Sequence, residues 1–457
     1  MEPAELLRSL PAIDKVKKSQ GALDLKKRWH AALVDQEIRA VVDFHRTEIR
    51  AGRATAAPSD PEAIADEAGR RLDTRLAPGI VRCINVSGVV LHTGLGRAVL
   101  PPAALAAIQR ECAAYSVVSV NREDGSRKRR ESNVARMLCA LTGAEAATIV
   151  NNNAAATLIA LRTLAAGREA IISRGQLVEI GGSFRMPDVF EAAGVRLREV
   201  GTTNRTHLKD YARAIGPDTA LLLRVHPSNY AITGFAKSVP LSEMIALGTE
   251  HGIPVMDDLG AGALLPLPPE PEIRTSVAAG ADLITCSGDK LIGGPQAGIL
   301  LGKKDVIDSV RRNPLFRTLR VDKLTLAALE ATVALFLEPD GPGDNHPSWR
   351  MLRETADSLR QRAKALAARI ESEVPALGVS LRDDTSQVGS GSMPGEALPT
   401  TLVALTAKDS PSALARRLRL GDPPVYTRIV DDMVCLDPRT LQADEEDWLL
   451  AALKGNA

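Results

Sequence analysis

One lysine in this sequence stands in a setting that suits covalent chemistry. Lys290 follows an apolar run at 281–285, which predicts a short buried strand. A Gly-Gly-Pro turn at 293–295 comes directly after it and breaks any regular element. Desolvation between these neighbours would lower the pKa of the amine toward the range where it is nucleophilic. A Schiff-base lysine for pyridoxal phosphate requires these properties, although a solvated lysine in a tight turn fits the same window.

Two further polar segments follow apolar runs earlier in the chain. The stretch 151–156 (Asn-Asn-Asn-Ala-Ala-Ala) opens a predicted helix, so its backbone N–H groups could bind a phosphate. Asp257 and Asp258 follow another run, where a carboxylate could pair with a pyridinium nitrogen, although an aspartate there is often only a helix cap. A phosphate cradle, a carboxylate and a lysine in this order match the layout of a fold-type I pyridoxal-phosphate enzyme.

The elements that would position these residues alternate along residues 80–335. Strand-like apolar runs, each followed by a polar or glycine-bearing loop and a helical pattern, occur at 147–150, 169–172, 220–225, 254–256 and 283–285. This rhythm predicts an α/β fold with a mainly parallel central sheet covered on both faces. Ligands of such sheets bind at the carboxyl ends of the strands, where the three polar segments are expected.

The domain organisation is expected to have three parts. Residues 1–62 read as a small helical N-terminal domain that ends in a linker with Pro58 and Pro61. Residues 63–338 would form the large cofactor-binding domain, and residues 339–457 a smaller α/β domain. In this last part a long helix is expected at 352–373, strands at 379–381, 401–405 and 433–436, and a terminal helix at 445–453.

Composition bounds the class of protein. The chain has 457 residues, of which 45% are hydrophobic and 25% charged, as in soluble globular proteins of two or three domains. Its net charge of +1 leaves any RNA contact to a local patch. The five cysteines have no spacing typical of a metal site, and no apolar run is long enough to span a bilayer. We expect a cytoplasmic protein without a metal or a membrane partner.

The first 53 residues carry a modest positive excess. They hold eleven Lys or Arg against eight Asp or Glu, and most of the excess lies between Lys15 and Arg28. A solvated helix face and a tRNA-binding surface both fit this pattern.

Long stretches of the chain match a known family. The matching stretches include Ser-Gly-Asp-Lys-Leu-Ile-Gly-Gly-Pro-Gln at 287–296 and Arg-Thr-Leu-Arg-Val-Asp-Lys at 317–323, and further ones lie at 85–98, 150–156, 179–185, 200–206 and 225–230. Together they resemble bacterial selenocysteine synthase, the L-seryl-tRNA(Sec) selenium transferase family, over nearly the whole chain.

The resemblance implies a PLP-dependent (pyridoxal 5'-phosphate) fold-type I transferase in selenoprotein biosynthesis. Such an enzyme converts L-seryl-tRNA(Sec) to L-selenocysteinyl-tRNA(Sec) through an aminoacrylyl-tRNA intermediate, with selenophosphate as the selenium donor. It also implies a large homo-oligomer, a decamer, and a contact between the N-terminal helices and tRNA(Sec).

Residue roles follow from the matching positions. The resemblance makes Lys290 the Schiff-base lysine and Asp289 a second catalytic residue, and it places Asp258 at the pyridine nitrogen, with Asp257 as the alternative. The other implied cofactor contacts are Asn152, Asn153, Ala154, His226 and Asn229.

A second group of positions matches substrate contacts. Arg97, Arg317 and Arg320 would grip selenophosphate, because the planar guanidinium binds oxyanions with two parallel hydrogen bonds. Thr202 and Thr203 match further active-site positions. Purely structural roles also fit these positions: His226 could cap a turn, and the arginines at 317 and 320 could be ordinary surface residues.

The sequence also departs from the family pattern. Between Tyr115 and Val134 the usual tyrosine- and acid-containing run is replaced, Gly94 stands where asparagine is usual, and Tyr426-Thr427 precedes Arg428 in place of Ile-Gly. A related lyase or aminotransferase that acts on a small free amino acid or amino sugar is therefore a second hypothesis. A non-catalytic tRNA-binding protein is a third.

Overall fold

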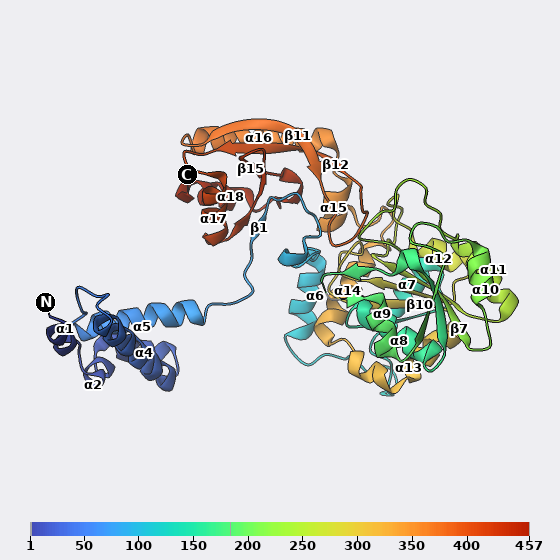
Figure 1. The fold of residues 1–457 in the computed structure, drawn as a ribbon, viewed down its shortest axis with the longest axis horizontal. Coiled ribbons are helices and arrows are strands. Elements are labelled where there is room, and N and C mark those ends of the chain that lie inside the picture. The colour runs from blue at the N-terminus through green and yellow to red at the C-terminus, as the bar shows by residue number, and fades with distance from the viewer. Residues whose placement is uncertain (1, 183, 457) are drawn as a thin grey trace. The chain divides into compact units, whose positions relative to one another are not determined.

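The computed structural model describes residues 2–182 and 184–456, which form two units, Met1–Arg82 and Cys83–Ala457 (Figure 1). The first unit is helical. Its helices are α1 Pro3–Ser9, α2 Ile13–Lys17, α3 Gln20–Arg28, α4 Ala31–Arg50 and α5 Pro61–Arg75. Within the described ranges no helix is long and apolar enough to cross a membrane.

The core of the helical unit joins α4 to α5. Val34, Ile38 and Val41 recur at helical spacing on α4 and pack with Ile64 and Leu72 of α5. Because α5 completes this core, the compact helical unit extends to Arg82, beyond the expected boundary at residue 62. The proline-bearing stretch at 54–60 is a loop within the unit and does not separate it from the rest of the chain.

The second unit begins with the part that holds the large sheet. Its helices are α6 Pro102–Cys112, α7 Ser132–Thr142, α8 Asn153–Ala165, α9 Met186–Ala193, α10 Leu208–Ala214, α11 Leu241–His251, α12 Ile273–Ala279, α13 Lys304–Arg312 and α14 Lys323–Leu335, with short 3-10 turns η1 Thr93–Leu95, η2 Arg174–Gln176 and η3 Pro314–Leu319. Its strands are β1 Ile84–Asn85, β2 Ala146–Val150, β3 Glu169–Ser173, β4 Glu179–Ile180, β5 Phe184–Arg185, β6 Arg196–Val200, β7 Thr219–Val225, β8 Val255–Gly260, β9 Leu283–Ser287 and β10 Gly298–Gly302.

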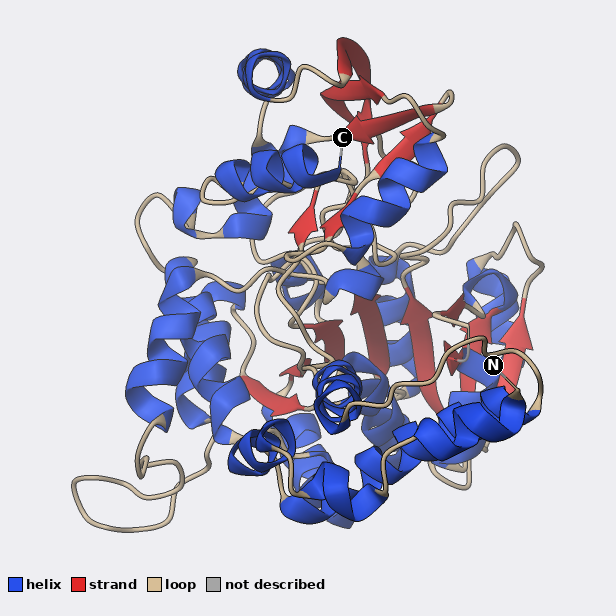
Figure 2. Ribbon diagram, turned by 90° about the vertical axis from the view of Figure 1, so that its left-hand side faces the viewer, coloured by secondary structure: helices blue, strands red, loops and turns tan. Residues whose placement is uncertain are grey.

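The large sheet has seven strands in the order β2-β10-β9-β8-β7-β3-β6. Every pair is parallel except those of β10, which runs antiparallel to both β2 and β9. Helices lie on both sides of the strands in Figure 2. The expectation of an α/β fold with a mainly parallel sheet is confirmed, and the polar segments after β2, β7, β8 and β9 come to one edge of it.

The C-terminal part of this unit holds a second sheet. Strands β11 Gly378–Ser386, β12 Leu398–Thr406, β15 Met433–Leu436 and β14 Arg428–Val430 pair antiparallel in this order. The other elements are η4 Gly343–Asn345, α15 Pro347–Arg353, α16 Ala356–Glu373, α17 Pro411–Leu420, β13 Val425–Tyr426, η5 Pro438–Thr440 and α18 Glu446–Asn456. The helix expected at 352–373 is interrupted, because Thr355 caps α16 by accepting a hydrogen bond from the Ser358 backbone N–H.

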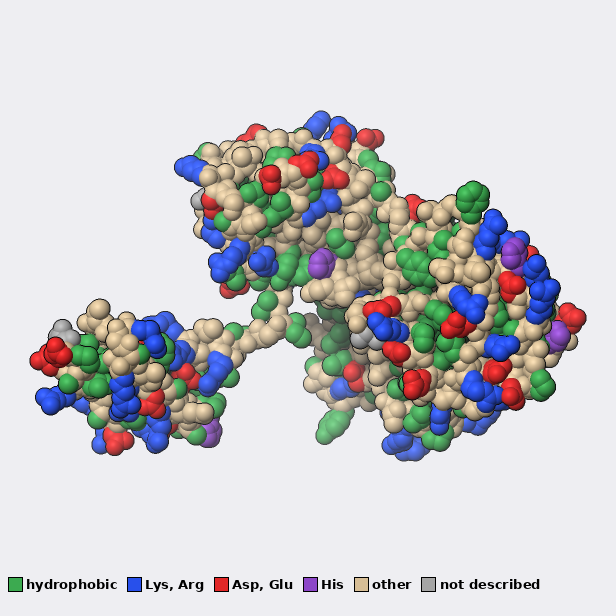
Figure 3. Space-filling view, in the orientation of Figure 1, with side chains coloured by type: hydrophobic (Ala, Val, Ile, Leu, Met, Phe, Trp, Pro, Cys, Tyr) green, Lys and Arg blue, Asp and Glu red, His purple; other side chains and the backbone are tan. Residues whose placement is uncertain are grey.

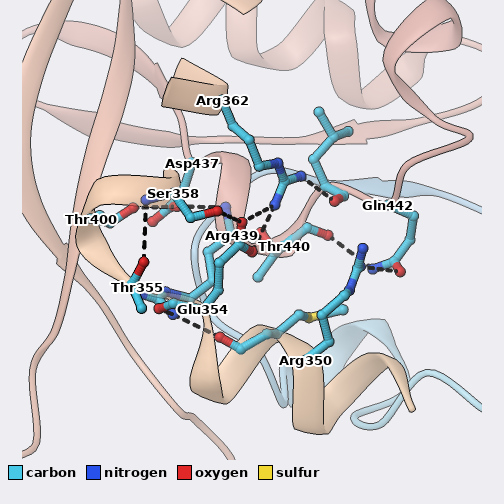
Figure 4. Close-up of polar contacts among 12 residues, drawn as sticks. Arg350, Glu354, Thr355, Ser358, Arg362, Thr400, Asp437, Arg439, Thr440 and Gln442 are labelled. Carbon is cyan, nitrogen blue, oxygen red and sulfur yellow. Dashed lines mark hydrogen bonds and ion pairs between the residues drawn. The ribbon is translucent and has the colours of Figure 1, made fainter. Parts of the chain in front are cut away.

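Arg439 connects the elements of this C-terminal part (Figure 4). Its side chain is fully buried and donates to Ser386 Oγ (2.9 Å), to the carbonyls of Met351 (2.7 Å) and Glu354 (3.1 Å), and to that of Pro399 (2.6 Å). A buried guanidinium needs such partners, because an unpaired charge costs far more than an unpaired neutral group. Arg439 thereby fixes the C-terminal end of α15 against the second sheet.

Candidate active site

A cavity of about 340 Å³ opens at the carboxyl edge of the large sheet. Loops after β2, β7, β8 and β9 form its wall. Of the residues expected from the sequence, its lining includes Arg97, Asn152, Asn153, Ala154, His226, Asp258, Asp289 and Lys290.

Lys290 lies on a tightly bonded turn at the end of β9. The Gly293 N–H donates to the Lys290 carbonyl (2.9 Å), and the Gly294 N–H donates to the Gly288 carbonyl (2.8 Å). Gly293 has a φ of +69°, and a Cβ there would lie 2.0 Å from the buried His346 ring, so only glycine fits. The ring of His346, the residue that caps α15, therefore packs against this turn and holds it in place.

The environment of Lys290 favours its neutral amine. Only 6% of the residue is exposed, and burial, followed by the charge of Arg97, lowers its pKa. Asp258, Asp289 and Glu270 act on the pKa in the opposite direction without reversing the shift.

Asp258 and Asp257 point to opposite faces of β8, as successive strand residues do. Asp258 lines the cavity, and its carboxylate accepts hydrogen bonds from Asn153 Nδ2 (2.9 Å) and Thr157 Oγ1 (3.0 Å). Asp257 is fully buried away from the cavity, where it pairs with Arg224 (3.1 Å) and accepts from Ser276 Oγ (2.7 Å). The geometry therefore favours Asp258 as the carboxylate of the site.

The start of α8 faces the cavity. Asn152 caps the helix by accepting a hydrogen bond from the Ala155 backbone N–H (2.8 Å), and Asn153 and Ala154 form the first turn. A Cβ on Gly298 would lie only 2.0 Å from the carbonyl oxygen of Asn152, so β10 needs glycine at this point. A helix start of this kind attracts anions through its free N–H groups and its dipole.

Arg97 and Asp289 form an ion pair of 2.6 Å on another side of the cavity. Arg97 has a φ of +65°, a strained conformation for a residue other than glycine, which is common at functional sites. Its Nε is buried and has no hydrogen-bond partner among the described residues. Both side chains also line an adjoining hollow of about 540 Å³, so an anion could reach the guanidinium from there.

The C-terminal part of the unit holds the segment that carries Arg97. The N–H groups of Val90 and Leu91 donate to the carbonyls of Gln387 (2.9 Å) and Val388 (2.7 Å). Nearby, Asp437 packs on Gly88 so closely that a Cβ there would lie 2.1 Å from its carboxylate. Arg97 therefore depends for its position on residues almost three hundred positions away in the sequence.

Two residues that the sequence analysis did not single out belong to the site. Thr157 lies four residues after Asn153, a spacing that places both on one face of α8 and could have indicated it. Glu270 lies in a Pro-Pro-Glu-Pro loop that carries no recognisable signal, yet its Oε2 is 3.6 Å from His226 Nε2. Burial lowers the pKa of His226 to about 4 and raises the pKa of Glu270.

Three expected residues do not line the cavity. Asn229 is exposed and donates from Nδ2 to the Glu179 carbonyl (2.8 Å). Thr202 is exposed and donates from Oγ1 to the Arg205 carbonyl (2.9 Å). Thr203 lines a neighbouring hollow of about 380 Å³, whose wall also includes His226.

Arg317 and Arg320 are also outside the cavity wall. Arg317 lies in η3 and Arg320 follows it, and both side chains are exposed. The carbonyl of Leu319, between them, accepts a hydrogen bond from the Asn151 N–H (3.0 Å). The two arginines therefore belong to a segment bonded to the loop that leads into α8.

The residues of the cavity fit pyridoxal phosphate. Its anionic phosphate matches the helix start at Asn153 and Ala154, its ring nitrogen matches the Asp258 carboxylate, and its aldehyde matches the Lys290 amine. No group of three or more His, Cys, Asp or Glu in the described ranges could hold a metal ion.

The fold and the site define a fold-type I pyridoxal-phosphate-dependent enzyme. The family model described as L-seryl-tRNA selenium transferase matches residues 83–442. The chain belongs to this family.

Curated relatives cover the full length. L-seryl-tRNA(Sec) selenium transferase of Solidesulfovibrio magneticus is 46% identical over 99% of this chain and 98% of its own. The protein of the same name from Nitratidesulfovibrio vulgaris is 45% identical over 98% of both chains. Among solved structures, D-glucosaminate-6-phosphate ammonia-lyase superposes with a TM-score of 0.60 at 21% identity, over 84% of this chain and 97% of that one, which is a likeness of fold.

Proposed function

We propose that this chain converts L-seryl-tRNA(Sec) to L-selenocysteinyl-tRNA(Sec), with pyridoxal 5'-phosphate as cofactor and selenophosphate as selenium donor. The observation that carries the proposal is the buried Lys290 amine in one cavity with Asp258 and the start of α8. Full-length relatives named for this transfer support the choice of substrate.

The cofactor would be held at its two ends and at its ring nitrogen. The N–H groups of Asn153 and Ala154, on a helix capped by Asn152, would bind its phosphate. Lys290 would bond its aldehyde, and His226, directly after β7, would contact its ring. Asn229 stays a proposed contact at the rim, supported only by its place in the same loop.

When bound, the cofactor supplies an electron sink for the charge left at the seryl Cα. Asn153 and Thr157 hold the Asp258 carboxylate in place, where it would keep a proton on the ring nitrogen of the cofactor. Burial lowers the pKa of the Lys290 amine, which favours the neutral form that would accept the Cα proton. Asp289 orients Arg97 through their ion pair at the cavity edge.

Selenophosphate is anionic, and three arginines would bind it. Arg97 supports this because it lines two adjoining hollows and because its buried Nε lacks a hydrogen-bond partner among the described residues. Arg317 and Arg320 support it through exposed guanidinium groups on the segment bonded to Asn151. Thr202 and Thr203 would contact the bulkier substrate outside the cavity, since both are exposed and Thr203 lines a hollow whose wall also includes His226.

The helical unit would contact tRNA(Sec). Figure 3 shows Lys and Arg side chains over the visible face of this unit, with Asp and Glu between them. Several of these cations already form ion pairs within the unit. Lys17 and Lys26, for example, both pair with Asp35 (2.9 Å each). Lys15 and Lys18 are exposed and have no ion pair within the described ranges, so they are the better phosphate contacts.

The chain would act as a homo-oligomer in the cytoplasm, where aminoacyl-tRNA is made. Large exposed apolar side chains at Tyr115, Val117, Val120 and Phe235 support an association between copies. A lyase or aminotransferase for a free substrate is not favoured, because the likeness to the ammonia-lyase is one of fold at 21% identity.

The test is transfer of labelled selenium from selenophosphate to seryl-tRNA(Sec) by the purified protein. Free L-serine and seryl-tRNA of an ordinary serine isoacceptor serve as controls in parallel reactions. Label on tRNA(Sec) alone supports the proposal. Turnover of free serine without label on tRNA(Sec) would replace it with the lyase alternative.

A further inference from the structure

Glu270 is a buried carboxyl group for which the transfer described above has no role. Its side chain is 1% exposed and lies in the loop between β8 and α12. Its Oε1 accepts a hydrogen bond from the Met393 backbone N–H, which holds the carboxyl group in place. Its Oε2 is buried without a hydrogen-bond partner among the described residues. A buried oxygen in this state needs either a proton of its own or a donor that can approach it.

The imidazole of His226 is in position to satisfy this oxygen. Its Nε2 lies 3.6 Å from Oε2, and a shift of about 0.5 Å would bring the two atoms to hydrogen-bond distance. Contacts of this kind tighten when an active site fills. His226 lines the cavity, and its backbone N–H donates to the Asp258 carbonyl (2.8 Å). The pair therefore joins a buried proton-binding group to the cavity wall.

We propose that Glu270 is a positioning residue that determines which ring nitrogen of His226 carries the proton. When Glu270 is protonated, its O–H donates to Nε2, and the ring proton is on Nδ1. When Glu270 is ionised, the ring proton is on Nε2 and is donated to the carboxylate, so Nδ1 becomes an acceptor. The net change is one proton released to solvent, and the imidazole is neutral in both states.

The charges around the pair are compatible with this exchange. Burial lowers the pKa of His226 to about 4, with a further contribution from Arg224 on β7, so the ring stays neutral around pH 7. Burial raises the pKa of Glu270, while the Met393 N–H and then the charge of Lys290 oppose that shift. Lys290 itself is subject to the charges of Arg97, Asp258 and Asp289, which shift its pKa.

The consequence for turnover rests on the proposed function. The Nδ1 atom of His226, a residue of the cavity wall, is a hydrogen-bond donor in one state and an acceptor in the other. The exchange would therefore change the bonding available to a cofactor held between Asp258 and Lys290. The Met393 contact makes this dependent on the C-terminal part of the unit. There, Gly391 packs on Asn229, where a Cβ would lie 2.9 Å from the asparagine Cβ.

The test observes the two ring nitrogens of His226 directly. Protein labelled with ¹⁵N-histidine and free of cofactor is titrated from about pH 5.5 to 9, and His226→Gln assigns the signal among the seven histidines. In the parent protein we expect one step between the two neutral forms of the ring, with a midpoint above the ordinary range of a glutamate.

Glu270→Gln should abolish that step. The glutamine carbonyl can still accept from the Met393 N–H while its NH₂ donates to Nε2, so the ring proton is expected on Nδ1 at every pH. In loaded enzyme the same variant should lose the step with that midpoint from its pH profile of kcat. Glu272→Gln, in the same loop, is the control and should leave both titrations unchanged.

A single neutral form of His226 across the whole range in the parent protein would overturn the proposal, and so would an unchanged step in Glu270→Gln. The titration of the parent protein decides the matter even if the variant does not fold. Failure of the parent protein to label tRNA(Sec) with selenium would refute the proposed function. The nitrogen titration would still test the proposal on Glu270 independently.

Discussion

Asn153 and Asp258 are joined by a hydrogen bond of 2.9 Å between the asparagine Nδ2 and the aspartate Oδ1. Asn153 begins the helix that faces the cavity, and Asp258 lies near the carboxyl end of β8 and supplies the carboxylate of the site. The contact holds the helix start and the carboxylate in a fixed relation, as a cofactor bound to both would require. Substitutions of single residues can test the role of each group in this arrangement.

Lys290→Ala should remove both the visible absorbance of the loaded enzyme and selenium transfer, while the protein stays folded. The amine is the group that would bond the cofactor, and no other lysine lines the cavity among the described residues. We expect a loss of roughly 10³-fold or more in kcat. Absorbance after addition of cofactor, with and without borohydride, and circular dichroism measure the two effects. Near-parental turnover would remove Lys290 from the mechanism.

Asp258→Asn and Asp257→Asn should have different effects. Asp258→Asn removes the charge that would keep the ring nitrogen protonated, so it should lower kcat with little change in stability. Asp257→Asn leaves Arg224 without its carboxylate and should destabilise the fold by about 1–3 kcal/mol. Urea unfolding and turnover of both variants distinguish them. The reverse pattern would make Asp257 the carboxylate of the site.

Arg317→Ala and Arg320→Ala should weaken the use of selenophosphate and leave cofactor binding intact. The loss of a charge-assisted contact with an oxyanion typically costs about 1.5–3 kcal/mol, or roughly ten- to a hundredfold in kcat/KM for that substrate. Arg312→Ala is a matched control, since Arg312 is exposed on α13 and donates to Ser309 of the same helix. Equal kcat/KM for selenophosphate in all three variants would show that Arg317 and Arg320 do not bind this substrate.

Deletion of residues 1–82 should lower the affinity for tRNA(Sec) and flatten its salt dependence, with cofactor absorbance unchanged. A cut at residue 53 would instead leave the apolar face of α5 exposed, because Ile64 and Leu72 belong to the core of the helical unit. Each lost phosphate contact should reduce the log–log slope by about 0.7–0.9.

Charge reversal refines the deletion. Lys15→Glu with Lys18→Glu should reproduce part of the loss, whereas Lys27→Glu should do so less, since Lys27 pairs with Asp24 (2.7 Å). If tRNA(Sec) binding is preserved in the deletion and only the oligomeric state changes, the helices serve assembly.

Stability should fall in mild acid because of His226. Its pKa is lowered from 6.5 to about 4 in the folded protein, so between these values the unfolded chain binds the extra proton and the folded one does not. The free energy of unfolding should therefore decrease as the pH falls from 6.5 to 4, by up to about 3 kcal/mol. Urea unfolding of the parent and of His226→Gln at pH 7 and pH 5 measures this, and an identical pH dependence would contradict it.

The sequence alone determined the local parts of the site. A lysine before a Gly-Gly-Pro turn, a polar run opening a helix and an acidic pair after an apolar run depend on neighbours in the chain, and they predicted the cofactor correctly. The same local signals predicted the buried parallel strands. They did not predict β6, in which three of the five residues are charged, or β10, which begins and ends with glycine.

The tertiary structure decided what depends on contacts between distant segments. Asp258 and not Asp257 reaches the cavity, because neighbouring strand residues face opposite sides and Arg224 occupies one of them. The helical unit extends to Arg82 because the apolar face of α5 finds its partners on α4. Glu270 lies 123 residues from the Met393 N–H that holds it, and chain folding alone brings these groups and His226 together.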